Sequence, residues 1–203
     1  MKKLLLTFAA VLLVSFFASA QKKYSVYAVG FYNQENLFDT CHDEGKKDYD
    51  FLPNGSYHWD GLKYSHKLHN MARALADMGT DVLPNVGCAM IGLSEVENAK
   101  VLTDIVNQPS LNARNIQFVH IEGPDKRGID CAMLYNPALF KLESDTLYQY
   151  VKELEKDSAF KTRGFLAIHG RLADEPVTVI VCHWPSRFSG PFYRESAARQ
   201  VKA

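Results

Sequence analysis

The chain has 203 residues, and 23 lysines and arginines balance 23 aspartates and glutamates, so the formal net charge is zero. Apolar residues make up 47% of the sequence and charged residues 23%, which is typical of a globular protein and excludes a disordered, collagen-like or coiled-coil chain. The neutral balance also excludes a protein that binds nucleic acid through bulk charge alone, and the length allows one domain or two small ones.

The first 20 residues have the three parts of a secretory signal peptide. Lys2 and Lys3 are followed by an almost unbroken apolar run over 4–17 and by the small residues Ala-Ser-Ala at 18–20. The alternative is a membrane anchor, but about 14 apolar residues fall short of the roughly 20 that span a bilayer. We therefore expect a mature chain of residues 21–203, exported to the periplasm or the outside of a bacterium. Cleavage removes two lysines and no acid, which leaves a net charge of −2.

The four cysteines at positions 41, 88, 131 and 182 are widely spaced and form no C-x-x-C pair. This spacing excludes a zinc knuckle and a thioredoxin-type motif. Export would permit disulfides. Cys131 and Cys182, however, lie in apolar runs typical of buried strands, where a free cysteine packs as a small apolar residue. We expect unpaired core cysteines, with a bridge as the alternative.

No internal repeat or low-complexity linker divides the chain, so a single domain is expected over 21–203. Runs rich in apolar and β-branched residues predict strands, in chain order, over 24–32, 89–96, 116–121, 129–135, 165–172 and 177–182. A long polar loop is expected over 39–57. Helical spacing predicts helices over 59–78, with Gly79 as the cap, over 99–107 and over 192–203. Strands that are apolar on both faces, mixed with helices, predict an α/β sandwich with covered sheets.

Polar side chains lie at the ends of four predicted strands. They occur in the segments 33–39 (NQENLFD), 94–98 (SEVEN), 125–130 (DKRGID) and 183–187 (HWPSR). Ligands of sheet proteins bind beyond strand ends, so we expect these groups to converge on one site.

The residue types at these strand ends suit a metal and a phosphate. Carboxylates with an amide favour a hard divalent cation such as Mg²⁺, and Glu95, directly after a buried strand, needs a partner or a metal. Arg127 and Arg187 could offer planar forks to phosphate oxygens. His183 could donate to the same phosphate or act as acid or base. The alternatives are solvated charges for the acids, a loop cation for Arg127 and a satisfied core histidine for His183.

Other chemistries find no support in the sequence. No nucleophile elbow, H-E-x-x-H motif, Walker A motif or dinucleotide fingerprint is present. His66 and His69 lie three residues apart on a predicted helix and could share a metal, but a solvated helical face is the better interpretation. Aromatic residues fall within strands rather than between basic residues, which favours a core over a base-stacking surface.

Four segments in this order, N-x-E-N-L-F-D, L-S-E-V-E-N, D-K-R-G-I-D-x-A and H-W-P-S-R, resemble the endonuclease/exonuclease/phosphatase superfamily. These are metal-dependent phosphodiesterases related to deoxyribonuclease I, and the secreted bacterial branch is the most similar. The resemblance runs from about residue 27 to the last residue. It implies an α/β fold, a four-layer sandwich of two mixed β-sheets flanked by helices. It also implies hydrolysis of phosphate esters, small molecules or nucleic acid, with Mg²⁺ or Mn²⁺.

The resemblance also implies roles by position in the four segments. These are Glu95 and Glu35 for the metal, His183 and Asn33 for catalysis, and Arg127, Asp130, Ser186 and Arg187 for the substrate. In this arrangement the histidine would hydrogen-bond the scissile phosphate. The slightly acidic mature chain, without an evident basic stripe, favours small phosphate esters, or nucleic acid held by local contacts, over long DNA.

Two later family motifs are absent from residues 191–203. These are a G-D-x-N-type strand end, which positions the attacking water, and an S-D-H-type element, which carries the general base. The chain is therefore expected to match the N-terminal two-thirds of the family domain, and to fold poorly and be inactive alone. Loss of a general base typically lowers the rate by about 10²–10⁴. The alternatives are a non-catalytic secreted phosphate-binding module and an inactive fragment.

Overall fold

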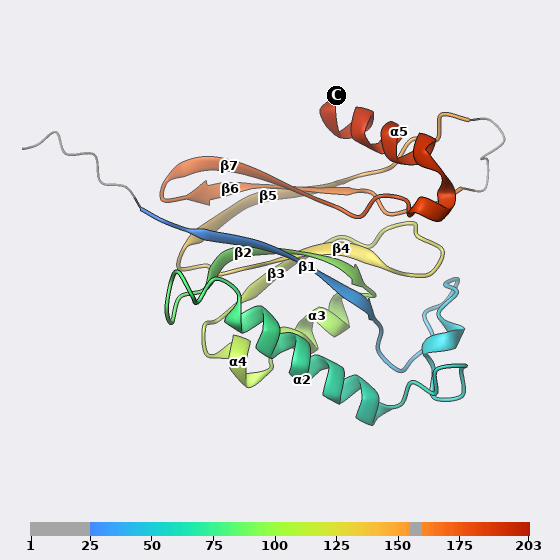
Figure 1. The fold of residues 1–203 in the computed structure, drawn as a ribbon, viewed down its shortest axis with the longest axis horizontal. Helices are drawn as coiled ribbons and strands as arrows, with labels where there is room; N and C mark the ends of the chain where they lie inside the picture. The colour runs from blue at the N-terminus through green and yellow to red at the C-terminus, as the bar shows by residue number, and fades with distance from the viewer. Residues whose placement is uncertain (1–24, 155–159) are drawn as a thin grey trace, which may run out of the picture.

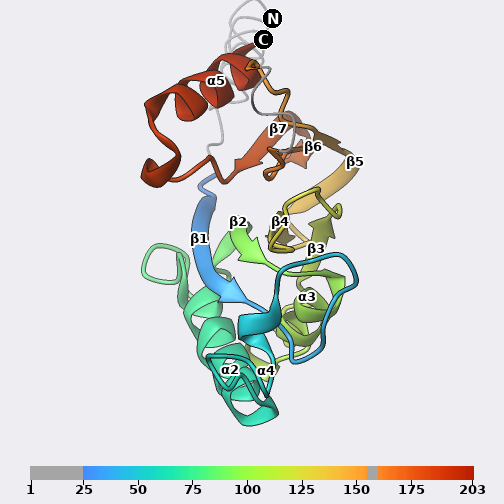
Figure 2. The same cartoon turned by 90° about the vertical axis from the view of Figure 1, so that its right-hand side faces the viewer.

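The computed structural model describes residues 25–154 and 160–203. Two β-sheets lie face to face, and Figure 2 shows the layers in order: helices α2, α3 and α4, the first sheet, the second sheet and helix α5. The predicted signal peptide lies outside the described residues. No helix in the described part of the chain is long and apolar enough to cross a membrane.

The first sheet is mixed and has the order β1-β2-β4-β3. Its strands are β1 (Ala28–Leu37), β2 (Cys88–Val96), β3 (Gln117–His120) and β4 (Asp130–Tyr135). β1 and β2 are parallel, so their carboxyl ends meet at one edge, whereas β4 runs antiparallel to both β2 and β3. The ends of β1 and β2 and the start of β4 therefore lie at the same end of the sandwich (Figure 1).

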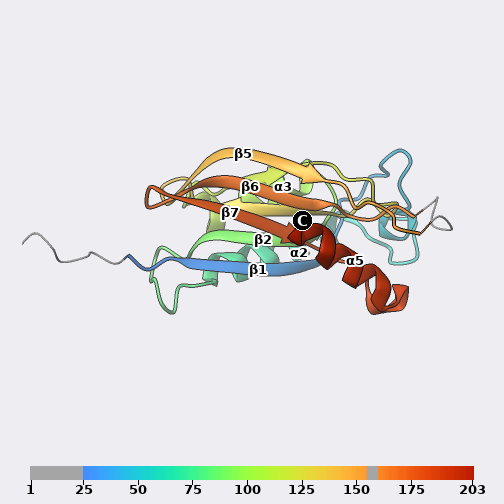
Figure 3. The ribbon, with the colours of Figure 1, turned by 90° about the horizontal axis from the view of Figure 1, so that it is seen from above.

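The second sheet is antiparallel over its described strands, β5 (Phe140–Tyr148), β6 (Phe165–Leu172) and β7 (Glu175–Cys182), in that order. Figure 3 shows that the strand axes of the two sheets are roughly aligned with each other, which is the aligned packing common in sandwiches. As a result, the end of β7 reaches the same end of the molecule as the ends of β1 and β2.

The helices begin at recognisable capping residues. α2 (Gly61–Asp77) starts after Asp60, whose carboxylate accepts from the amide of Lys63, and α3 (Ala99–Val106) starts after Asn98, which caps two amides. α4 (Pro109–Asn112) and α5 (Pro191–Lys202) each open with proline, whose missing N–H would be unpaired there in any case. Two short 3₁₀ helices, η1 (Tyr49–Phe51) and η3 (Arg187–Ser189), lie in loops.

Two apolar cores hold these layers together. The first lies between the helices and the first sheet and includes Leu68, Leu75, Leu93, Leu102 and Ile105, all nearly or fully buried. The second lies between the sheets and includes Met90, Met133, Phe140, Leu166 and Ile168. Each fully buried side chain of this size stabilises the fold by about 1.5–3 kcal/mol. β2 contributes to both cores because its successive side chains point to opposite faces.

Most predicted elements are confirmed, with three differences. The first strand starts at Ala28 and continues into the polar segment as far as Leu37, because its ladder with β2 extends that far. β5 was not predicted, since most of its residues are exposed, among them Lys141, Glu143 and Asp145. The short helix α4 was also not predicted. All four cysteines are free, as expected. Cys88 and Cys131 are buried, whereas Cys182 is partly exposed and Cys41 is exposed, so these two are not in the core.

Candidate active site

β1 and β2 both leave regular strand geometry at the same level of the sheet. The register between them is irregular from Asn33 to Leu37. Glu35, Asn36 and Glu95 have φ values of 51°, 61° and 60°, in the left-handed region that residues with a Cβ rarely adopt. Each such residue costs of the order of 1 kcal/mol, and such strain is characteristic of functional sites.

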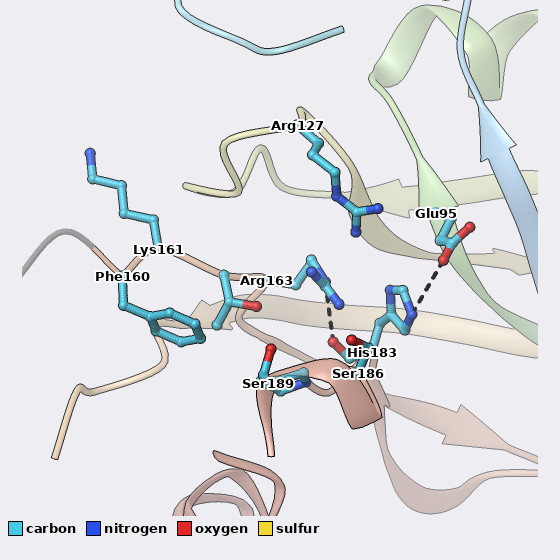
Figure 4. Close-up of a pocket in the computed structure, with 10 residues that line it drawn as sticks. Glu95, Arg127, Phe160, Lys161, Arg163, His183, Ser186 and Ser189 are labelled. Atoms are coloured by element: carbon cyan, nitrogen blue, oxygen red, sulfur yellow. Dashed lines mark hydrogen bonds and ion pairs between the residues drawn. The ribbon is translucent and has the colours of Figure 1, made fainter. Parts of the chain in front are cut away.

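The carboxylate of Glu95, in β2, contacts groups from the ends of β1 and β7. Its Oε2 accepts a hydrogen bond from the amide of Asn36 in β1 at 3.0 Å, and its Oε1 lies 3.5 Å from Nε2 of His183, just after β7. The Glu95 side chain is 15% exposed. The two sheets therefore contribute to one half-buried carboxylate that still faces an opening (Figure 4).

A lysine from α2 supports the kinked end of β1. The ammonium of Lys67 donates to the carbonyl oxygens of Glu35 and Asn36, the second at 3.2 Å. Burial lowers the pKa of Lys67, while the nearby charges of Glu35 and Glu95 act in the opposite direction. Lys67 carried no sequence signal, because only the tertiary fold brings α2 under this strand end.

His183 is held in its neutral form. Burial lowers its pKa to about 4, and the charge of Arg163 acts in the same direction, against the opposing charge of Glu95. Its Nδ1 is buried and has no hydrogen-bond partner among the described residues. At neutral pH the ring therefore carries one N–H donor and one acceptor nitrogen.

Glu95 and His183 open into a pocket of about 300 Å³. The other residues that line it are Arg127, Phe160, Lys161, Thr162, Arg163, Pro185, Ser186 and Ser189. Figure 4 shows Arg127 and Arg163 between the glutamate–histidine pair on one side and Lys161 on the other. The pocket thus combines one acid with three cationic side chains, which suits an anionic ligand with oxygen atoms.

Arg163 joins two of the loops that form this pocket. Its Nε donates to the carbonyl of His183 at 3.2 Å, its Nη2 to that of Trp184 at 3.4 Å, and its Nη1 to Oδ2 of Asp125 at 2.9 Å. Asp125 in turn accepts from the amide of Arg127 at 2.9 Å. The sequence analysis did not identify Arg163, since a single arginine before a predicted strand has no motif around it.

The structure brings only some of the predicted site residues together. Glu95, Arg127, His183 and Ser186 line the pocket, whereas Asn33, Glu35, Asp130 and Arg187 do not. Asn33 instead accepts from the amide of Glu35 at 2.7 Å, and the Glu35 side chain is exposed. Arg187 lies in η3, next to Ser186.

Asp130 belongs to a separate group of possible metal ligands. One ligand atom each from His120, Glu122 and Asp130 lies within 4.8 Å of the others. The Asp130 carboxylate lies 3.3 Å from His120 and accepts from the amide of Gly123 at 3.1 Å. Glu122 is paired with the ammonium of Lys46 at 2.8 Å, so a cationic side chain already neutralises part of this group.

The sequence profile of the Endonuclease/Exonuclease/phosphatase family matches residues 28–203. The chain belongs to this family. The match extends over all the described strands and helices, and the resemblance inferred from the four segments is confirmed. No curated protein matches the chain.

Two solved structures of other proteins are similar to this chain at low sequence identity. Humanized TDP2 of D. rerio is 13% identical, with a TM-score of 0.52 over 85% of this chain and 53% of that chain. ANGEL2, described as a 2′,3′-cyclic phosphatase, is 15% identical, with a TM-score of 0.45 over 59% of this chain and 31% of that chain. The chain thus spans about half the length of the TDP2 structure, and that likeness confirms the two-sheet α/β sandwich.

Proposed function

We propose that this protein hydrolyses phosphate esters with the help of a divalent cation, Mg²⁺ or Mn²⁺, held at Glu95. The observation that carries the proposal is the meeting of Glu95 and His183 in one pocket with Arg127 and Arg163. Membership of the endonuclease/exonuclease/phosphatase family supports this class of reaction. We also propose that residues 1–20 direct export.

The residues around Glu95 fit a hard, water-rich cation. Mg²⁺ keeps several waters and is usually held by one or two carboxylates together with substrate phosphates. The Glu95 carboxylate is half-buried. Among the described residues it contacts one backbone amide and one neutral imidazole, so no cationic side chain in direct contact neutralises its charge. When bound there, the cation would neutralise charge on a phosphate oxygen. Glu35, on the neighbouring strand end, is proposed as a second acidic group for the same ion.

The protein's own side chains would bind and orient the phosphate. Arg127 projects into the pocket with its side chain 49% exposed, and its guanidinium can donate two parallel hydrogen bonds to phosphate oxygens. His183, neutral at pH 7, can donate from one ring nitrogen to the same phosphate. Ser186 adds a hydroxyl at the wall of the pocket. These groups stabilise charge that develops on phosphorus-bound oxygens.

Asn33 and Arg163 would position the site without touching the phosphate. Asn33 fixes the kinked strand end through the amide of Glu35, and Arg163 fixes the carbonyls of His183 and Trp184. Both would keep the pocket in shape before the substrate binds, which avoids reorganisation during the reaction.

Metal binding tests the proposal independently of turnover. We would titrate the 203-residue chain with Mn²⁺ and follow free Mn²⁺ by electron paramagnetic resonance. Glu95→Gln should weaken binding by about tenfold or more, because it removes the ionised ligand. Glu175→Gln, an exposed acid of β7, is the matched control and should bind as the wild type does. A loss caused instead by Asp130→Asn would move the ion to the His120 group and overturn the assignment to Glu95.

Hydrolysis of bis-p-nitrophenyl phosphate by the same variants tests the reaction. Turnover that needs Mn²⁺ and disappears in Glu95→Gln is the expected result for a hydrolase. A chain that is folded by circular dichroism and binds Mn²⁺ at Glu95 but gives no turnover would instead be a phosphate-binding module.

A further inference from the structure

A second pocket, of about 430 Å³, lies beside the first and is lined mainly by lysines. Lys46, Lys47, Lys126 and Lys161 line it, together with Gly45, Pro124 and Asp125. We call these four side chains and the hollow between them the lysine pocket. Lys161 lines both pockets, so the lysine pocket lies next to the site of Glu95 and His183.

The lysines come from three loops that are distant in the sequence but fixed together. The amide of Lys47 donates to the carbonyl of Lys126 at 2.8 Å, and the ammonium of Lys46 donates to the carbonyl of Gly123 at 3.1 Å. Gly128 has a φ of 81°, and a Cβ there would lie 3.1 Å from Cγ of Lys46, so this loop packs directly on the lysine stem. These contacts fix the loop of Lys46 and Lys47 to that of Lys126, and the ion pair between Arg163 and Asp125 ties the loop of Lys161 to the latter.

The charges in the lysine pocket are only partly balanced. Lys46 is paired with Glu122 and Asp125 with Arg163, at 2.8 Å and 2.9 Å. Lys47, Lys126 and Lys161 are exposed and make no ion pair with any described residue. Like charges held together in this way attract an anion. The whole chain has zero net charge, so this concentration of positive charge is local.

We propose that the lysine pocket is a second phosphate subsite, which binds the neighbouring phosphate of a phosphodiester chain whose reacting phosphate lies at Glu95 and His183. This rests on the proposed function and gives its substrate class: a short, single-stranded nucleotide chain. Lysine ammoniums bind phosphate as point charges and read no base. Phe160 lines the first pocket, and one face of its ring stacks on Tyr193 at a centroid distance of 4.9 Å, so a base would stack on the opposite face.

Binding of a fluorescein-labelled hexathymidylate to the 203-residue chain, measured by anisotropy in EDTA, tests the subsite without any turnover. The double variant Lys47→Ala, Lys126→Ala should lower the affinity by about tenfold or more at low salt. It should also flatten the slope of log K against log salt by about 0.7, since the lysine pocket holds one phosphate and each phosphate contact on a single strand contributes about 0.7. The matched control is Lys141→Ala, Lys202→Ala, which removes the same charge from exposed positions outside both pockets.

Two results would overturn the proposal. Equal losses in the two double variants would show that the oligonucleotide responds to overall charge. Inorganic tripolyphosphate, used as competitor, should bind at least tenfold more weakly than the oligonucleotide, because it carries no base that can contact Phe160. If the oligonucleotide and tripolyphosphate bind with equal affinity, and the double variant Lys47→Ala, Lys126→Ala weakens both equally, the pocket is a site for free anions. The anisotropy assay contains EDTA and no metal, so its outcome can be interpreted even if Mn²⁺ does not bind at Glu95 or no hydrolysis occurs.

Discussion

Arg163 and Asp125 form a buried ion pair, with Nη1 of the arginine 2.9 Å from Oδ2 of the aspartate and side chains only 9% and 5% exposed. The pair links the loop that carries Arg127 to the loop that carries His183, which lie more than 50 residues apart in the sequence. One planar guanidinium donates to a carboxylate and two carbonyls from three separate nitrogens, a fixed arrangement that the single nitrogen of a lysine ammonium does not reproduce.

We predict that Arg163→Gln raises the pKa of His183 from about 4 toward its ordinary value of 6.5, because the Arg163 charge helps to keep it low. The rise should be partial, since burial is the larger cause. Arg163→Lys keeps the positive charge and should leave the pKa of His183 low, although it removes the guanidinium hydrogen bonds to Asp125 and the two carbonyls. Titration of the His183 ring proton by NMR measures both. An unchanged pKa in Arg163→Gln would show that the pair has no electrostatic influence on the histidine.

Breaking the same pair should also destabilise the fold. Removal of one partner of a buried ion pair typically costs about 3–5 kcal/mol, because the remaining charge is left without a partner. Asp125→Ala should therefore lower the free energy of unfolding in urea by about 3 kcal/mol. Asp81→Ala, an exposed aspartate in the loop after α2, should change it by less than about 0.5 kcal/mol. Similar losses in the two variants would contradict a buried, paired Asp125.

Glu97 should make stability fall as the pH rises. Burial raises its pKa to about 8, and the charges of Asp39 and Asp43 act in the same direction. The unfolded chain ionises this group near its ordinary value of 4.5, so between about pH 4.5 and pH 8 folding takes up a proton. The free energy of unfolding should therefore decrease over this range, by at most about 1.4 kcal/mol per pH unit.

Glu97→Gln should remove this slope while keeping an acceptor for the amide of Asp39, which now donates to the Glu97 carboxylate at 2.7 Å. Urea unfolding at a series of pH values measures the effect. Glu44→Gln, at an exposed acid, should retain the wild-type profile. A wild-type stability that rises between pH 5 and pH 8 in parallel with that of Glu97→Gln would contradict a protonated Glu97.

Gly79 should not tolerate a side chain. Its φ is 74°, and a Cβ there would lie 2.7 Å from Cβ of Ala28 and 3.2 Å from the sulfur of Cys88. Gly79→Ala should lower the stability by about 2 kcal/mol, from the left-handed backbone together with the collision. Gly61 is the first residue of α2, and a Cβ there would have no atom within 4 Å. Gly61→Ala should therefore leave stability unchanged or raise it by up to about 1 kcal/mol. Thermal unfolding followed by circular dichroism compares the two.

Two leucines of neighbouring helices give a test of the first core. Leu102 in α3 is fully buried, whereas Leu62 in α2 is 65% exposed. Leu102→Ala should destabilise the chain by about 2–5 kcal/mol through lost contacts and a cavity, and Leu62→Ala by less than about 0.5 kcal/mol. Urea unfolding at neutral pH measures the difference, and equal effects would place α3 outside the core.

The sequence predicted the elements whose own pattern specifies them. The apolar run of β2, the helical spacing of α2 and the glycine at its end are local signals, because side-chain period and backbone freedom are properties of a few neighbouring residues. β5 escaped prediction for the same reason: its exposed face is polar, and its pairing with β6 depends on residues 17 to 32 positions away along the chain. The four polar segments carried enough order to identify the family.

The sequence placed Glu95 and His183 at strand ends, but only the tertiary structure decided that they face each other at 3.5 Å and that Asp130 turns toward His120. Arg163 and the lysine pocket were also invisible along the chain, because no stripe of basic residues exists in one dimension. Lys47, Lys126 and Lys161 become neighbours only when three loops meet at one end of the sandwich. Hydrophobic periodicity fixes which elements form, whereas long-range packing and backbone hydrogen bonds fix which of their ends meet.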